Sequence, residues 1–151
     1  MTPIDAEQLK LYTEHRGIDI PLLDHIKLRY CPPAVTGGLG HIVLRVEREH
    51  LNGWNSAHGG LIMTLLDVAM ALTASYRDEQ RRGVVTIEMK TNFLRSGGDI
   101  GEVLEAFGSA RHCTRSLAFC EAELRNSQGE AVATASGTFK YINKPFPLAD
   151  A

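Results

Sequence analysis

One carboxylate stands inside a long apolar segment, and this setting is the first indication of chemistry in the chain. Asp67 interrupts the apolar residues 61–74, which follow a polar stretch at 52–57 and the tripeptide His58-Gly59-Gly60. Removing water from a lone carboxylate is costly unless the group is paired or used. Asp67 is therefore a candidate catalytic group, and a satisfied structural carboxylate is the alternative.

The tripeptide before the apolar segment suits the stabilisation of an oxyanion. A helix start offers unpaired N–H groups and the positive end of the helix dipole, and glycine lets a substrate carbonyl approach the backbone. Asp67 lies nine residues after His58, which is about 13 Å along a helix. Asp67 and Gly59 of one chain therefore cannot act on the same carbonyl carbon. If both are catalytic, they come from different subunits.

The elements that would position these residues follow from apolar periodicity and from glycine and proline. We predict a helix at 1–16 with Thr2 as N-cap and Gly17 at its end, a turn at 32–40, a loop at 52–57, a helix at 59–76, a tail at 143–151, and strands at 25–31, 41–47, 84–94, 100–111, 116–124 and 131–141. In strand 84–94, strict alternation places Val85, Ile87, Met89 and Phe93 on one face and Thr86, Glu88, Lys90 and Asn92 on the other.

These elements predict one α+β domain over residues 1–151. The helix at 59–76 is apolar on nearly every side, which is typical of a buried helix. Strands joined by short turns favour an antiparallel sheet, and that sheet has to wrap around this one long central α-helix. A short N-terminal helix completes the expected fold.

Composition restricts the partners and the compartment. A formal net charge of -2 gives no reason to expect nucleic acid or an anionic membrane as the main partner. The three cysteines, Cys31, Cys113 and Cys120, indicate no disulfide framework and have no zinc-ligand spacing, so no metal is expected. The first residues lack a signal peptide, and the apolar run 61–74 is shorter than a membrane span. We expect a soluble, cytoplasmic protein.

Three segments together resemble a known family. The pattern Asn52…His58-Gly59-Gly60…Asp67, the strand residues 86–95 and the hairpin residues 126–133 resemble the hotdog-fold acyl-CoA thioesterases of the phenylacetic-acid-degradation (PaaI-like) type. The resemblance covers about residues 25–142. It implies hydrolysis of an aryl- or fatty acyl-CoA to a carboxylic acid and CoA, with no metal and no cofactor beyond the CoA of the substrate. It also implies homodimers, often paired into tetramers, with active sites at the dimer interface.

The resemblance assigns roles to single residues. Asp67 is the catalytic carboxylate, as nucleophile or as general base, and the Gly59 N–H polarises the thioester carbonyl. Asn52 helps to place the substrate or water, and Thr86 assists the carboxylate. His58 is a further catalytic candidate, although bracing of the loop is the simpler interpretation. Thr86 has its own simpler interpretation, as a β-prone residue on a polar strand face.

A second set of residues is predicted to bind substrate. Trp54, Met63, Met70 and Phe93 are candidates for the acyl pocket, although such residues are more often core, and Gly60 is a further candidate for substrate binding. Arg95, Arg111, His112 and Arg115 form a scatter of positive charge near strand ends, which could contact the phosphates of CoA or simply be solvated. Ser116 follows Arg115, and Thr114 stands before this pair where the family often has Gly. Asn55 is a second departure from a family glycine.

Two other functions remain open from the sequence. A hotdog hydratase or dehydratase would need a His and a carboxylate that move protons on neighbouring carbons, which Asp67 with Asn and Thr around it fits less well. A non-catalytic acyl-CoA-binding module would keep the fold without needing Asp67.

Overall fold

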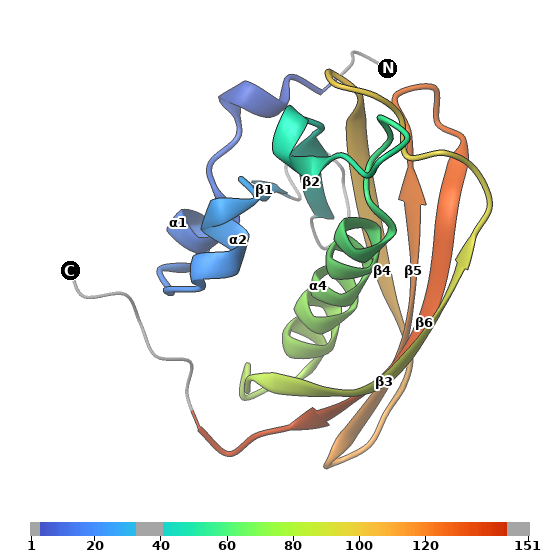
Figure 1. The fold of residues 1–151 in the computed structure, drawn as a ribbon. Helices are drawn as coiled ribbons and strands as arrows, with labels where there is room; N and C mark the ends of the chain where they lie inside the picture. Colours follow the sequence, from blue (N-terminus) through green and yellow to red (C-terminus); the bar gives the residue numbers. More distant parts are fainter. Residues whose placement is uncertain (1–3, 33–40, 145–151) are drawn as a thin grey trace.

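A six-stranded antiparallel sheet curls around one long helix, as predicted (Figure 1). The computed structural model describes residues 4–32 and 41–144. The strand order is β1-β2-β4-β5-β6-β3. The elements that build the sheet and its helix are β1 (Arg29–Cys31), β2 (His41–Arg45), α4 (Gly59–Arg77), β3 (Val84–Phe93), β4 (Val103–Cys113), β5 (Leu117–Arg125) and β6 (Ala131–Tyr141).

Helix α4 forms the centre of the core, but it is not buried on every side. Its apolar residues pack against the sheet and against the N-terminal segment in one cluster, which includes Leu65, Leu66 and Met70. A flank that carries Met63 and Asp67 stays half-exposed. The sequence predicted complete burial because apolar residues surround the helix. One chain supplies too little sheet to cover them all.

The sheet approaches the helix closely at Gly108 on β4. A Cβ atom at this position would collide with the carbonyl oxygen of Ala69 and with the Thr73 hydroxyl. Glycine is therefore required where β4 crosses α4.

By length and composition, α4 is long and apolar enough to cross a membrane, with a mean hydropathy of 1.4 over its best window. The helix has 19 residues and so extends beyond the predicted apolar run 61–74 at both ends. In the described part of the chain, 56% of that window is buried inside the fold, as in a core helix.

The N-terminal segment differs from the predicted single helix. It contains the short elements η1 (Ala6–Gln8), α1 (Tyr12–Arg16) and α2 (Pro21–His25). The helix is interrupted because the chain around Leu11 pairs with β1: Leu11 forms a β-bridge with Arg29, and the Tyr30 N–H donates to the Lys10 carbonyl at 3.1 Å.

Several predicted boundaries also change. Gly17 ends α1 with a φ of 65°, as expected, but Asp5 caps η1, and Thr2 lies outside the described residues. The first strand begins only at Arg29, because α2 occupies its expected start. The fourth begins at Val103, since Gly98 and Gly101 adopt positive φ in the turn before it. The predicted turn and tail fall mostly on residues 33–40 and 145–151, outside the described residues.

The two edges of the sheet differ. Edge strand β1 has three residues, and the bridge to Leu11 covers part of its outer side. Edge strand β3 has ten residues, pairs with β6 alone within residues 4–32 and 41–144, and exposes Val85, Ile87 and Phe93. A long apolar strand with one unpaired edge is a surface that favours pairing with another strand.

Candidate active site

A shallow hollow of about 230 Å³ lies between α4 and β3 and contains Asp67. It is lined by Met63, Thr64, Asp67, Thr86 and Met89. The Thr86 Oγ1 donates to Asp67 Oδ1 at 2.7 Å. The structure thus joins two of the predicted site residues, and the hydroxyl fixes one carboxylate oxygen while it leaves Oδ2 available.

A β-bulge in β3 makes this arrangement possible. The register with β6 shifts between Thr86 and Glu88, so that Ile87 is the extra residue. Strict alternation placed Thr86 and Met89 on opposite faces, and this prediction is wrong. The bulge turns both side chains to the hollow at Asp67. Sequence reasoning missed Met89 for this reason, whereas Thr64 had a usable signal in its spacing of three residues from Asp67 on one helix face.

At the start of α4, a side chain caps the N–H group of Gly60 but not that of Gly59. The ring nitrogen Nδ1 of His58 accepts from the Gly60 N–H at 2.9 Å, which makes His58 the N-cap. His58 therefore braces the helix start, the simpler of its two interpretations. The Gly59 N–H has no acceptor among residues 4–32 and 41–144 and is available to a ligand.

Glycine at positions 59 and 60 leaves room around this start. A Cβ atom at Gly60 would lie 3.1 Å from His58 Nδ1 and would crowd the cap. A Cβ atom at Gly59 would meet only the ring of Phe93, at 3.5 Å. Phe93 therefore lies beside the candidate oxyanion donor.

The loop that leads into α4 is held by Asn52. Its Oδ1 accepts from the backbone N–H groups of Trp54 at 2.8 Å and Ser56 at 3.2 Å. Asn52 thus has a structural function in the chain, and its Nδ2 is the group left for a substrate. Trp54 is 90% exposed, so it belongs neither to the core nor to a pocket formed by one chain.

The predicted scatter of positive charge divides between two ends of the sheet. Arg95 lies just past the end of β3 that contacts Gly59, where it pairs with Glu130 at 3.4 Å. Arg111, His112 and Arg115 lie toward the opposite end, on β4 and in the turn after it. A single chain therefore has no common basic rim. Arg111 pairs with Glu121 at 3.4 Å, and the His112 ring stacks on Phe119.

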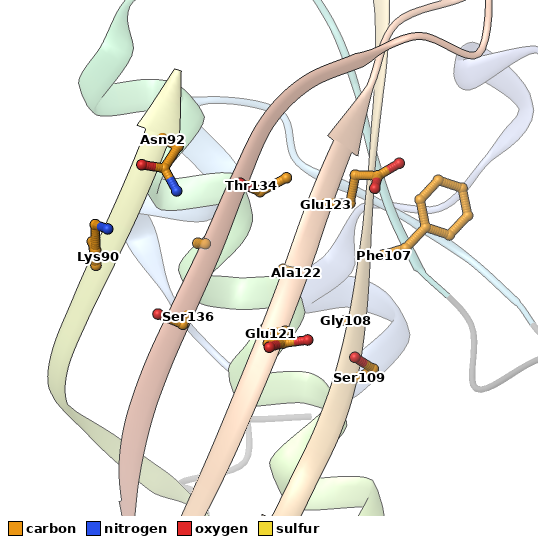
Figure 2. A pocket seen from close by; sticks show the side chains of 11 residues that line it. Lys90, Asn92, Phe107, Gly108, Ser109, Glu121, Ala122, Glu123, Thr134 and Ser136 are labelled. Atoms are coloured by element: carbon orange, nitrogen blue, oxygen red, sulfur yellow. The ribbon is translucent and has the colours of Figure 1, made fainter. Parts of the chain in front are cut away.

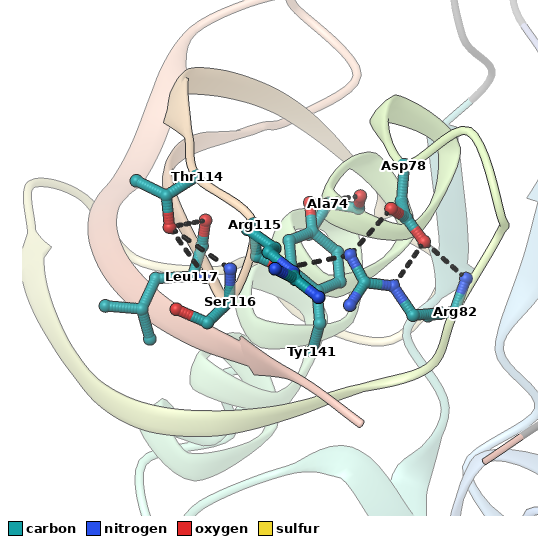
Figure 3. Close-up of polar contacts among 8 residues, drawn as sticks. All are labelled: Ala74, Asp78, Arg82, Thr114, Arg115, Ser116, Leu117 and Tyr141. Atoms are coloured by element: carbon teal, nitrogen blue, oxygen red, sulfur yellow. Dashed lines mark hydrogen bonds and ion pairs between the residues drawn. The ribbon is translucent and has the colours of Figure 1, made fainter. Parts of the chain in front are cut away.

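The β4–β5 turn carries Arg115 and Ser116, and Thr114 organises it (Figure 3). The Thr114 Oγ1 accepts from the N–H groups of Leu117 at 3.0 Å and Ser116 at 3.3 Å. Thr114 thus supplies turn hydrogen bonds at the position where the family often has glycine. The Arg115 guanidinium has no acceptor within the described ranges, so it is free to bind an anion.

An arginine that sequence reasoning missed ties this turn to the end of α4 (Figure 3). Arg82 donates to the two oxygens of Asp78 at 3.0 Å each and to the Arg115 carbonyl at 3.0 Å. Its guanidinium also lies over the ring of Tyr141 at 4.6 Å, and the Tyr141 hydroxyl donates to the Ala74 carbonyl at 2.9 Å. The hydrogen bonds from Arg82 lower the pKa of the Asp78 carboxyl.

A larger hollow, about 560 Å³, lies elsewhere, on the outer face of the sheet (Figure 2). Its side chains include Lys90, Asn92, Glu121 and Ser136. The sheet separates it from α4, and it contains none of the predicted site residues. We therefore assign the candidate site to the smaller hollow, where the carboxylate and its hydroxyl partner are.

Metal-ligating side chains and cysteines are the other groups that could carry chemistry. Among the described residues, no three His, Cys, Asp or Glu side chains are grouped so that they could hold a metal ion. The three cysteines are free, and burial raises the pKa of the Cys120 thiol to about 11.

Comparison with known proteins identifies the family. The profile described as Thioesterase superfamily matches residues 55–133. A putative esterase of Pseudomonas aeruginosa is 30% identical over 119 residues, which cover 79% of this chain and 87% of that protein. The acyl-coenzyme A thioesterase PaaI of Escherichia coli is 30% identical over 121 residues, which cover 80% and 75% of the two chains.

Solved structures of related proteins have a similar fold. A Bacillus halodurans protein solved with CoA is 28% identical, with a TM-score of 0.63 over 67% of this chain and 70% of that one. The E. coli PaaI structure gives a TM-score of 0.75 over 94% and 96% of the two chains, and at 22% identity it supports the fold alone. The chain belongs to the thioesterase superfamily, as a PaaI-like hotdog protein. Its predicted class, thioester hydrolase, is confirmed at this level.

Proposed function

We propose that this protein hydrolyses acyl-CoA thioesters, with Asp67 as the general base that activates water. The observation that carries the proposal is the hydrogen bond from Thr86 Oγ1 to Asp67 Oδ1, at 2.7 Å, in a hollow next to the uncovered edge strand. The relatives named as thioesterases or solved with CoA support the substrate class.

The base role is favoured over direct attack by Asp67 on the substrate. A carboxylate that attacks must bring one oxygen to the carbonyl carbon and form an anhydride. Thr86 instead holds one oxygen of Asp67 in place, and a charge-assisted hydrogen bond of this kind restricts the movement of the carboxylate that direct attack requires. The remaining oxygen is placed to take a proton from water.

The oxyanion donor is proposed to come from a second chain. Asp67 and Thr86 lie at the start of β3, whereas Gly59 lies beside Phe93 at its end. If two β3 edges pair antiparallel about a two-fold axis, the start of one strand lies next to the end of the other. This homodimer would bring Asp67 of one protomer toward the Gly59 N–H of its partner, and would cover apolar side chains of β3. Pairing of such dimers into tetramers remains a prediction.

The proposed reaction uses only groups of the chain and the substrate. Asp67 Oδ2 takes a proton from water as the water oxygen bonds to the thioester carbon, and the Gly59 N–H donates to the resulting oxyanion. The carbon–sulfur bond then breaks, and the proton on Asp67 passes to the leaving sulfur. The products are the carboxylic acid and CoA.

The same dimer suggests where the CoA phosphates bind. It would place the Arg115 end of one sheet near the Arg95 end of its partner, and so would bring the two separated basic groups together. Arg115 has the free guanidinium and is the better candidate. We expect Arg115→Ala to raise KM for acyl-CoA but not for the N-acetylcysteamine thioester of the same acid, which has no phosphate. An equal rise for both substrates would contradict phosphate binding.

The proposal is tested by thiol release from a panel of aryl- and fatty acyl-CoAs. We expect Asp67→Asn to lose about 10²–10⁴ in kcat, the usual contribution of a general base. Glu79→Gln makes the same carboxylate-to-amide change on an exposed residue and should retain full activity. No thiol release by the wild type across the panel would contradict the thioesterase proposal. Hydration of enoyl-CoA without thiol release would favour the hydratase.

A further inference from the structure

Thr64 lines the Asp67 hollow, and neither the motif nor the proposed reaction gives it a function. It lies three residues before Asp67, so the two side chains share one face of α4. Both line the hollow together with Thr86. The Thr64 Oγ1 donates its hydrogen to the Gly60 carbonyl at 2.9 Å.

The hydroxyl hydrogens in this hollow are already used. Thr64 donates to Gly60, and Thr86 donates to Asp67 Oδ1. Each hydroxyl has a single hydrogen and keeps lone pairs that can accept. With Asp67 ionised, the hollow therefore offers hydrogen-bond acceptors: the two threonine oxygens and Asp67 Oδ2. A thioester carbonyl is itself an acceptor and gains nothing there, whereas water can donate two hydrogens.

We propose that Thr64 Oγ1 positions the attacking water. Resting on the proposed function, this inference assigns one hydrogen of the water to Asp67 Oδ2 and the other to Thr64. The water hydrogen that is donated to Asp67 is the proton that transfers as the oxygen–carbon bond forms. The water hydrogen that is donated to Thr64 stays on the water oxygen, which becomes part of the product acid. Two fixed hydrogens hold the water's orientation and direct a lone pair at the thioester carbon.

A purely structural Thr64 is the alternative, because threonine in a helix often bonds to the carbonyl four residues earlier. Thr73 on the same helix makes the same bond, to the Ala69 carbonyl at 3.0 Å, but it is buried and outside the hollow. Thr73 is therefore a useful control: the residue type, the bond and the helix are the same, whereas its burial and its position relative to Asp67 differ.

The experiment compares Thr64→Val, Thr64→Ser and Thr73→Val in thiol release and in thermal unfolding. We expect Thr64→Val to lower kcat by about tenfold at unchanged KM, the usual effect of one lost hydrogen bond. Serine keeps the hydroxyl and should restore kcat. Thr73→Val should change only Tm. An unchanged kcat in Thr64→Val, or a loss that serine does not restore, would overturn the assignment.

A second readout follows the water itself. Methanol has one O–H hydrogen and cannot donate to both Asp67 and Thr64, so the wild type should discriminate against it. In Thr64→Val the ratio of methyl ester to acid should rise several-fold, which a structural role would not cause. An unchanged ratio would overturn the inference for Thr64 alone. Full activity of Asp67→Asn would instead overturn the proposed function.

Discussion

The division of the site between two chains can be tested by mixing two inactive variants. Gly59→Pro removes the proposed oxyanion donor. Gly59 is the first residue of α4, where proline fits, and His58 before it has a ψ of 138°, the extended conformation that proline requires of its predecessor. The matched control is Gly59→Ala, which keeps the N–H and adds a Cβ atom in ordinary contact with Phe93 at 3.5 Å.

The expected losses follow from the proposed roles. Removal of one oxyanion donor lowers kcat by about 10²–10³, or about 2.7–4 kcal/mol. Asp67 lies eight residues after Gly59, about 12 Å along the helix. The water on Asp67 and the N–H of Gly59 must both lie about 3 Å from the reacting group, so one helix cannot supply both.

The assay mixes equal amounts of Gly59→Pro and Asp67→Asn, allows subunit exchange and follows thiol release. A mixed dimer joins Asp67 of the first variant to Gly59 of the second and regains one of its two sites. Random exchange makes half of the dimers mixed, so about a quarter of wild-type activity should return. If native mass spectrometry shows exchange and the activity stays at the level of the parent variants, the shared site is refuted.

Three further predictions concern the chain itself. Thr86→Val should lower kcat by about tenfold, and Thr86→Ser should restore it, because the bond to the carboxylate is charge-assisted. Gly108→Ala should lower the free energy of unfolding by about 1–3 kcal/mol through overpacking, whereas Gly53→Ala, which meets nothing within 4 Å, serves as its control in denaturant unfolding. Arg82 lowers the pKa of Asp78, so Asp78 stabilises the fold above the carboxyl's unfolded pKa, and this contribution is lost as pH falls through the folded pKa. The difference in unfolding free energy between wild type and Asp78→Asn should therefore shrink below the ordinary carboxyl pKa of 3.8; a pH-independent difference would contradict it.

The sequence predicts the long helix and its reacting carboxylate well. Helix 59–76 was predicted to within one residue of α4, because 19 residues of apolar pattern and a glycine-rich start are strong local signals. Asp67 stood out by the cost of burying an unpaired charge. The meeting of Asp67 with Thr86 was available only through the family resemblance.

The incorrect predictions are caused by contacts between residues that are far apart in the sequence. A bulge depends on the partner strand, so alternation within β3 could not predict that Thr86 and Met89 face the same hollow. The predicted N-terminal helix is interrupted because Leu11 pairs with β1, some 18 residues later in the chain. Likewise, closeness of Arg95 and Arg115 to strand ends gave no indication of which end of the sheet each would occupy.

Both ends of α4 are anchored, and this has a consequence for the specificity toward acyl chains. Its start is capped by His58, and its end is held by Arg82, Asp78 and Tyr141 against the β4–β5 turn. A helix anchored at both ends keeps Asp67 in a constant position relative to β3, which is the preorganisation that catalysis requires. One chain leaves the hollow shallow and open, so the shape of the acyl pocket has to come from the surface that closes it. We therefore expect substitutions on the exposed side of β3 to change the preference for acyl chains more than kcat for the best substrate.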